Sequence, residues 1–301
     1  MAVRRRGVER GTLYPGHVID ERPPEHVLAA FGIKDGGPTP LGDGWTGSWR
    51  HGEIVLALVA DHARAAWSAK VREGLFVDGL RLARPVRSTD GRYVVAGWRA
   101  DTYVAGSPEP RHDEVISAGV RFHEACAGLD RPRFLTQGPV PPWTDVDVFT
   151  AADRTAWEER PLKVLPLGAP QVGDSEERQR CVEIIGQLAA LRKSTESPSQ
   201  LVHGDLYGTV LFDGPAAPGI TDIAPYWRPP SWAAGVAVVD ALSWGDADDG
   251  LIERWDALPE WPQMLLRALI FRLAVHVLHP RSTPEAFPGL LRTAALVRMA
   301  V

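Results

Sequence analysis

Lysine and cysteine are both scarce in this chain of 301 residues. Lysine occurs at only four positions, which are Lys34, Lys70, Lys163 and Lys193. The two cysteines, Cys126 and Cys181, are too few for a disulfide framework and lack the spacing of a metal-binding motif. Both lie in apolar helical patterns, so we expect buried free thiols, as in proteins of a reducing cytoplasm.

The chain also lacks a strong excess of either charge and a long uncharged apolar run. Its formal net charge of −5 and its pI near 6.0 argue against a general nucleic-acid binder. Residues 1–20 contain no continuous apolar segment, so we expect no signal peptide. The most apolar late stretch, 264–278, is interrupted by Arg267, Arg272 and His276, so we do not expect it to cross a membrane.

Turn and periodicity signals divide the chain into a strand-rich first part and a helix-rich second part. Between residues 39 and 104 we expect one hairpin about His51-Gly52, a helix over 63–76, and a second hairpin about Asp90-Gly91. A connector over 101–110 follows. Helical periodicity then predicts helices over 111–127, 147–157, 176–191, 232–242 and 263–278, with a loop rich in proline and glycine over 161–175.

One late segment carries most of the recognisable chemistry. Residues 201–212 are typical of a strand, a polar turn that contains Asp205, and a second strand. The pattern from Val210 to Asp222 predicts a hairpin. If the carboxylates of Asp205 and Asp222 meet at one edge, they suit Mg²⁺ binding and deprotonation of a hydroxyl during phosphoryl transfer. For each aspartate, a turn-forming role is the alternative.

The run His203-Gly204-Asp205-Leu206 with the later Asp222 resembles the aminoglycoside phosphotransferase and choline kinase branch of the protein-kinase-like fold. The chain as a whole is similar to an actinobacterial, mycobacterial-type subgroup of that family. The resemblance implies a bilobal α+β fold with ATP and Mg²⁺ as cofactors. It places a small antiparallel-sheet N-lobe at 23–104 and a mostly helical C-lobe at 105–301, after a disordered extension at 1–22.

Two positions depart from the family's pattern. Val210 stands where the family carries a metal-binding Asn, and the nearest oxygen ligand is Thr209. Ala57 stands where related kinases carry the lysine that contacts the α- and β-phosphates. A charge-assisted contact of that kind contributes about 1.5–3 kcal/mol. Water can replace one ligand of Mg²⁺, so the loss of the Asn alone need not abolish metal binding. Combined with Ala57, it argues against ordinary kinase turnover.

Other charged residues near Ala57 offer replacements for the missing lysine. Arg50, Arg64 and Lys70 are the candidates, although a solvated basic side chain is the simpler interpretation of each. Glu73, on the helix over 63–76, corresponds to the usual ion-pair partner of the lysine and has no lysine to hold.

Gly42, Gly44 and Gly47 match Gly-x-Gly-x-x-Gly. The motif precedes a strand hairpin and no helix, which argues against a dinucleotide fingerprint. By resemblance to kinases it is interpreted as a lid over the phosphates, with an ordinary glycine turn as the alternative. Asp101 and Tyr103 lie in the connector, where the resemblance implies the nucleotide cleft.

The resemblance also assigns roles to the aspartates and to His203. Asp205 would accept the proton of the attacking hydroxyl or orient that hydroxyl, and Asp222, helped by Thr209, would hold Mg²⁺. His203 is expected to hold the turn by packing and hydrogen bonding. Asp240 lies in an apolar helix, where an unpartnered carboxylate would be costly, so we expect it to support the catalytic loop.

Acidic and aromatic residues after Asp222 are candidates for binding the acceptor. They are Trp227, Asp246, Asp248 and Asp249. In aminoglycoside phosphotransferases, acidic residues of the C-terminal helices hold the cationic acceptor. Acids that favour a helix N-terminus, and a packing role for the loop over 226–230, are the alternatives.

Two functions therefore remain open. The first is ATP-dependent phosphorylation of a hydroxyl on a small, cationic or neutral acceptor, which the intact Asp205 and Asp222 favour. The second is a pseudokinase that binds a nucleotide, a metabolite or a protein partner without transfer, which Ala57 and Val210 favour. If protein atoms fill the space where adenine should bind, the kinase-like fold would be retained without the phosphoryl-transfer activity.

Overall fold

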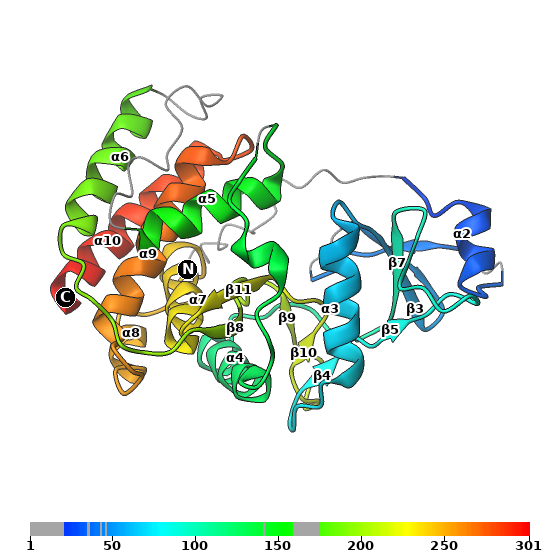
Figure 1. The fold of residues 1–301 in the computed structure, drawn as a ribbon. Coiled ribbons are helices and arrows are strands. Elements are labelled where there is room, and N and C mark those ends of the chain that lie inside the picture. Colours follow the sequence, from blue (N-terminus) through cyan, green and yellow to red (C-terminus); the bar gives the residue numbers. More distant parts are fainter. Residues whose placement is uncertain (1–20, 35–36, 43, 46, 141, 159–174) are drawn as a thin grey trace, which may run out of the picture. The chain divides into compact units, whose positions relative to one another are not determined.

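The computed structural model describes residues 21–34, 37–42, 44–45, 47–140, 142–158 and 175–301 (Figure 1). Residues 1–20 of the expected extension and residues 161–174 of the expected loop lie outside the described residues. Contacts divide the chain into two units. Of the described residues, the sheet unit contains those within 21–128 and 207–224, and the helical unit contains those within 129–206 and 225–301.

The sheet unit is built on an antiparallel sheet with the strand order β1-β2-β3-β7-β5, in which β6 also pairs with β7. Its strands are β1 (Thr39–Pro40), β2 (Ser48–His51), β3 (Ile54–Leu58), β5 (Pro85–Val86), β6 (Val94–Val95) and β7 (Trp98–Thr102). Its helices are α2 (Glu25–Ala30), α3 (His62–Gly74) and α4 (His112–Cys126). The hairpin predicted about His51-Gly52 and the two longer helices of this unit are thereby confirmed.

A second, three-stranded sheet contains the predicted late hairpin. Strand β9 (Val210–Leu211) pairs antiparallel with β10 (Gly219–Ile220), and β10 pairs parallel with β4 (Arg81–Leu82). Because of these pairings, residues 207–224 belong to the sheet unit by contact. The units therefore follow a different division from the expected lobes at 23–104 and 105–301, and that lobe assignment stays a prediction.

The second predicted hairpin differs from the structure in its strand pairing. The turn about Asp90-Gly91 forms, with the Ser88 N–H donating to the Arg92 carbonyl at 2.9 Å. However, β5 and β6 both pair with β7, and β6 reaches β7 through a two-residue turn at Ala96-Gly97. Both residues of that turn have positive φ, 47° and 82°. Alanine rarely adopts this conformation, so the sequence over 93–99 predicted one continuous strand and gave no sign of a turn at Ala96-Gly97.

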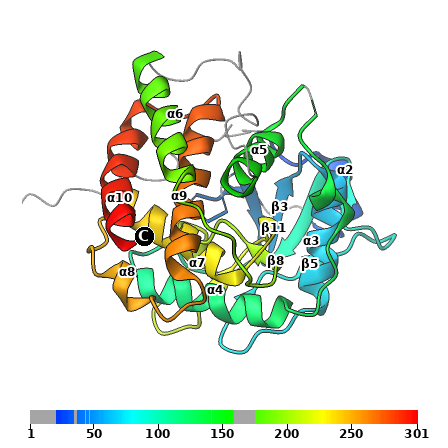
Figure 2. The same ribbon diagram turned by 60° about the vertical axis from the view of Figure 1, so that its left-hand side comes forward.

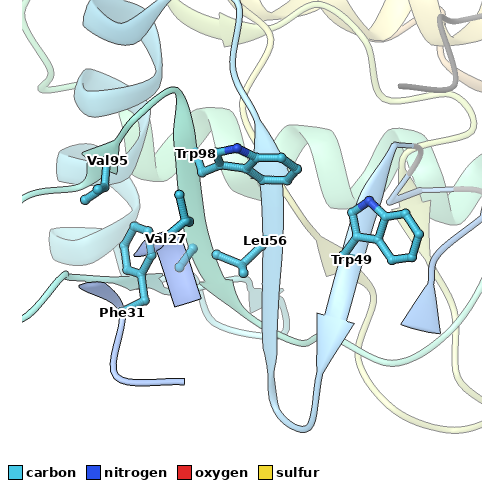
Figure 3. Packing of buried hydrophobic residues seen from close by; sticks show 7 residues of the cluster. Val27, Phe31, Trp49, Leu56, Val95 and Trp98 are labelled. Carbon is cyan, nitrogen blue, oxygen red and sulfur yellow. The ribbon is translucent and has the colours of Figure 1, made fainter. Parts of the chain in front are cut away.

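Side chains of successive strand residues point to opposite faces of the main sheet. Trp49, Leu56 and Trp98 face helix α2 and pack with its Val27 and with Phe31, just after its end, as Figure 3 shows. On the other face, Val55 packs in a separate cluster. That second cluster consists of Trp45, Val55, Ala83, Val104 and Leu211. Burial of the large indole and aliphatic groups on both faces stabilises the sheet.

The helical unit is organised around α9 (Trp261–Leu278), which α5, α6, α7 and α10 all contact (Figures 1 and 2). The helices around it are α5 (Asp145–Trp157), α6 (Ser175–Ala189), α7 (Pro230–Trp244), α8 (Leu251–Arg254) and α10 (Phe287–Ala300). A two-stranded sheet of β8 (Gln200–His203) and β11 (Pro225–Arg228), and the short helices η1 (Arg133–Thr136) and η3 (Pro284–Ala286), complete this unit.

Helix α9 is long and apolar enough to cross a membrane by length and composition. However, 89% of its apolar window is buried inside the unit, as in the central helix of a globular core. The two cysteines are free and buried, as predicted. Burial raises the pKa of both thiols, that of Cys126 to about 12, so neither is a thiolate at neutral pH.

Helix α10 approaches α7 closely at Gly289. A Cβ atom at Gly289 would lie 2.1 Å from the carbonyl oxygen of Ser243, and a backbone atom in a helix cannot move aside alone. We therefore expect Gly289→Ala to lower the free energy of unfolding by about 1–3 kcal/mol. Gly74→Ala is the control, because a Cβ there has no atom within 4 Å. Urea denaturation measures both, and a Gly289→Ala variant as stable as the control would contradict the close approach.

Candidate functional site

In the helical unit, the polar turn follows directly from strand β8. The backbone N–H of Asp205 donates to Nδ1 of the buried His203 at 3.1 Å, which is the kind of contact a supporting residue makes. Gly204 passes beneath the ring of Tyr226, where an added Cβ would lie 2.4 Å from the ring. The turn therefore requires glycine at this position to hold Asp205 where it is.

The Asp205 carboxylate is held by an arginine from the core helix α9. Nη2 of Arg272 donates to Oδ1 of Asp205 at 3.2 Å. The same guanidinium binds both oxygens of Asp240 on α7, at 2.6 Å through Nε and at 2.5 Å through Nη2. Asp240 is fully buried, so its charge is balanced by Arg272 rather than by solvent. Asp240 thus supports Asp205 through Arg272.

Arg272 was not among the residues predicted for the site. The sequence did contain a signal for this pair. Asp240 and Arg272 are single, opposite charges in two apolar helical segments, and a charge is tolerated in a protein core only when it is paired. About a third of the Asp205 side chain, 33%, is exposed. A carboxylate that is fixed on one side and exposed on the other can orient a hydroxyl or accept its proton.

In the sheet unit, Asp222 follows strand β10 and is surrounded by donors. Oδ1 accepts hydrogen bonds from the Ser68 hydroxyl and from the backbone N–H of Ile223, both at 2.7 Å. Oδ2 lies 2.8 Å from Nη1 of Arg99. Nε of Arg72, on α3, lies 3.8 Å from Oδ1. Both carboxylate oxygens are therefore engaged by groups of the protein.

A second carboxylate completes this cluster. Oδ1 of Asp101 accepts a hydrogen bond from Nη1 of Arg72 at 2.7 Å, and its Oδ2 lies 3.5 Å from Nη1 of Arg99. We call Arg72, Arg99, Asp101 and Asp222 the arginine–aspartate network. Its two cations and two anions balance. Asp101 is buried within it, so the structure places this predicted nucleotide-binding residue among protein charges.

Arg99 occupies the place where the sequence lacked a cation. It pairs directly with Ala57 in the β3–β7 register, just as Asp101 pairs with Val55. Because directly paired residues share a face of the sheet, the guanidinium of Arg99 emerges beside the small side chain of Ala57. The cation beside Ala57 is thus supplied by the neighbouring strand.

The three candidate cations near Ala57 pair elsewhere or are exposed, which agrees with the simpler interpretation given to each. Arg50 pairs with Glu53 and lies 3.6 Å above the ring of Tyr103, and Arg64 pairs with the N-cap Asp61. Lys70 is exposed.

Glu73, expected to have no lysine to hold, pairs instead with Arg87. Hydrogen bonds from Arg87 and Tyr93 lower the pKa of Glu73 to about 2. An ion pair between a helix acid and a strand lysine was expected. The structure instead pairs a helix base, Arg72 of α3, with a strand acid, Asp101 of β7.

The electrostatics of Asp222 follow from this network. Burial by itself would raise the pKa of Asp222, but Arg99, Arg72 and the Ser68 hydroxyl lower it to about 2. Burial would likewise lower the pKa of Arg99, whereas Asp222 and Asp101 raise it. The carboxylate is therefore ionised and already neutralised by guanidinium groups.

The residues around Asp222 do not fit a divalent cation. Arg99 takes the position beside Oδ2 that a metal would need, and Val210 is buried opposite Ile220 and offers no oxygen. Thr209 lies in the turn before β9. Among the described residues, no group of three or more His, Cys, Asp or Glu side chains could hold a metal ion. We derive no step through Mg²⁺ from this arrangement.

The glycine-rich turn between β1 and β2 is fixed by contacts. Gly44 has φ +79°, and a Cβ there would lie 2.2 Å from a methyl carbon of Leu211. Its carbonyl accepts a hydrogen bond from the Thr221 hydroxyl at 3.0 Å. Gly42 accepts a hydrogen bond from the Trp45 N–H, and Gly47 has φ +74°. Asp43 and Thr46 lie outside the described residues, and the lid role of this turn stays a prediction.

Trp45, within this turn, points into the sheet unit. Its indole N–H donates to the carbonyl of Val104 at 3.1 Å. The indole stacks with the ring of Tyr103, with centroids 6.3 Å apart and planes inclined by 25°. The sequence motif drew attention to the glycines, and the tryptophan between them was not singled out.

The candidate acceptor residues lie in the helical unit. Trp227 is in β11, across from Leu201, and is half-buried. Asp246, Asp248 and Asp249 are exposed between α7 and α8, and Asp248 pairs with Arg254 at 2.8 Å. The four candidates therefore lie in two different segments of the helical unit, and their shared role in binding an acceptor stays a prediction.

No protein-family model matches the chain, and no curated protein sequence matches it. Its structure is similar to that of aminoglycoside phosphotransferases. One, from Alicyclobacillus acidocaldarius, has a TM-score of 0.56 at 15% identity, with 93% of this chain and 94% of that chain covered. At these identities the similarity shows the fold, which is the predicted bilobal, α+β protein-kinase-like fold.

Two further structures of this class contain ligands. A thermostable mutant of aminoglycoside phosphotransferase APH(4)-Ia, in a ternary complex with AMP-PNP and hygromycin B, has a TM-score of 0.53 at 15% identity and covers 92% of this chain and 98% of its own. The GDP and kanamycin complex of APH(2")-IIia has a TM-score of 0.53 at 14% identity, with 91% and 98% covered. The predicted actinobacterial subgroup has no support from these similarities.

The buried pair of Asp240 and Arg272 predicts a large effect of removing one partner. Asp240→Ala removes the nearer carboxylate from the buried guanidinium and leaves the partly exposed Asp205 at 3.2 Å, so we expect a loss of about 3–5 kcal/mol in the free energy of unfolding. The matched control is Asp240→Leu with Arg272→Met, which removes both charges and should recover most of the stability. Guanidinium denaturation measures both, and an Asp240→Ala variant as stable as wild type would refute the charge balance.

The ion pair of Asp222 predicts a pH-dependent contribution to stability. The pKa of Asp222 is lowered from 3.8 to about 2 in the folded protein, so the pair stabilises fully above pH 4, and this stabilisation is lost as the pH falls towards 2. Asp222→Asn should therefore lower the melting temperature at pH 7, by a difference that shrinks below pH 4. The control is Asp213→Asn, an exposed aspartate of the same hairpin. A pH-independent difference for Asp222→Asn would contradict the pairing.

Proposed function

We propose that this chain is a kinase-fold binding or regulatory protein that does not carry out Mg²⁺-dependent phosphoryl transfer. The observation that supports this most is the ion pair of Arg99 and Asp222, at 2.8 Å, opposite Ala57. The kinase-like neighbours support the architecture, and the arginine–aspartate network bears on the chemistry.

The charge balance of the network disfavours a divalent ion. A metal at Asp222 would either displace Arg99 from Oδ2 or lie beside two guanidinium groups, Arg99 and Arg72, whose charge repels it. Displaced, Arg99 would still be next to Asp101, and the exchange would cost the bond between Arg99 and Asp222. With Val210 in place of an oxygen ligand, little in this cluster offsets that loss.

The proposed ligand is a small cationic molecule. The neighbouring structures contain hygromycin B and kanamycin, and the exposed acids of this chain between α7 and α8 are of the sign that attracts such cations. A protein partner is the other form that a binding role can take. The binding role needs neither ATP nor Mg²⁺.

A second candidate is phosphorylation of a hydroxyl on the same class of molecule, with ATP as donor. Asp205 favours it, because this carboxylate is oriented by Arg272 and is partly exposed, as a base or orienter must be. The neighbours solved with AMP-PNP and GDP support nucleotide binding by this fold. For this function, Arg99 would have to leave Asp222 when the nucleotide binds.

The two candidates are separated by thermal shift and transfer assays on the same protein. Under the proposed function, millimolar ATP with Mg²⁺ leaves the melting temperature of wild type unchanged, and no phosphorylated product forms with aminoglycosides, amino sugars or choline-like alcohols. A cationic ligand from the panel raises the melting temperature by mass action.

Arg99→Gln provides a gain-of-binding control, because it frees Oδ2 of Asp222. Mg²⁺ should stabilise this variant and not wild type, whereas Arg87→Gln, at an exposed arginine, should behave as wild type. Mg²⁺-dependent turnover by wild type that is lost in Asp205→Asn and Asp222→Asn would establish the second candidate instead.

A further inference from the structure

We propose that the indole of Trp45 occupies the nucleobase position of this fold, so that the chain is closed to adenine nucleosides and nucleotides while Trp45 is in place. Removing the indole should open a site for a planar bicyclic heteroaromatic compound that carries an N–H donor. This inference deepens the proposed function by naming what fills the base position. It involves no metal ion and no phosphate.

The first support is the hydrogen bond of the indole to the connector. Nε1–H of Trp45 donates to the carbonyl of Val104 at 3.1 Å, and only 5% of Trp45 is exposed. Val104 lies two residues after the end of β7, in the segment where the sequence predicts the nucleotide. An amino group on an aromatic base offers the same kind of donor to this carbonyl, so indole and base compete for one acceptor.

The second support is the shape and polarity of the surroundings. The indole packs with Val55 from β3, with Ala83, and with Leu211 from β9. The ring of Tyr103 stacks with it. Apolar walls with one aromatic ring and one polar acceptor are the ordinary composition of a site for a flat aromatic ligand. Trp45 supplies that flat ring from within the chain.

The third support is the way the indole is held. The backbone on either side of Trp45 is bonded, since its N–H donates to Gly42 and its carbonyl accepts from Ser48, each at 3.0 Å. The preceding Gly44 is pressed against Leu211 and bonded by Thr221. The turn that resembles a phosphate lid thus fixes an internal side chain against the connector.

Trp49 provides a matched comparison. It is equally buried, at 4% exposed, and its indole N–H also donates to a backbone carbonyl, that of Glu21 at 2.9 Å. However, Trp49 faces the other side of the sheet and packs with Leu56 and Trp98 (Figure 3). Substitution of either tryptophan makes a cavity of similar size, but only the cavity at Trp45 borders Val104.

The test compares Trp45→Ala and Trp49→Ala with wild type, using adenosine and indole as probes without metal. We expect both variants to melt at a lower temperature than wild type. Adenosine and indole should raise the melting temperature of Trp45→Ala by several degrees and leave wild type and Trp49→Ala unchanged. Purine riboside and 1-methylindole, which have no N–H donor on the ring system, should raise it less, because the bond to Val104 is not re-formed.

Calorimetric titration with adenosine gives the deciding result. If wild type binds adenosine as tightly as Trp45→Ala does, or if folded Trp45→Ala binds neither probe, the inference is wrong. Should Trp45→Ala fail to fold, Trp45→Val empties most of the indole volume and keeps an apolar side chain. Adenosine binding by wild type without any phosphoryl transfer would overturn this inference alone. Mg²⁺-dependent transfer would overturn the proposed function.

Discussion

The constraint on which both halves of the candidate site depend is that a carboxylate removed from water needs a cation close to it. In the sheet unit Arg72 and Arg99 meet that need for the buried Asp101 and also pair with Asp222. In the helical unit Arg272 meets it for the buried Asp240. The cations come from the chain, through arginines whose planar groups bind two acids at once. Asp205 and Asp222 differ from Asp101 and Asp240 in degree, since 33% and 43% of their side chains remain exposed.

This constraint changes the meaning of the resemblance to phosphotransferases. Similarity of fold is compatible with either function, because function depends on the groups at the site. The positions that resemble the family, Asp205 and Asp222, are both present, but only Asp205 retains surroundings suited to accepting a proton. The glycine motif lies in a turn between β1 and β2, and Trp45 inside that turn donates a hydrogen bond to the connector at Val104.

Local patterns predicted individual helices and hairpins, because each leaves a short signal in the sequence. The kinase-like fold itself was predicted from the resemblance carried by residues 203–206 and Asp222. The failures are of two kinds. Positive φ at Ala96 hid a tight turn, since nothing in alanine indicates that conformation. The partners of the acids, Arg99 and Arg272, lie far along the chain from them, and only strand register and helix packing bring them together. Trp45 was missed for the same reason.

The pairing of β4 with β10 has a consequence for synthesis. Strand β4 ends at Leu82, but its neighbour in the sheet is not made until Ile220, after most of the chain has left the ribosome. The sheet unit therefore cannot be completed from its first 128 residues, and it must wait while the beginning of the helical unit emerges. A fragment that ends at residue 128 would lack strands β9 and β10 of its own sheet unit, so this protein should be made and handled as one uninterrupted chain.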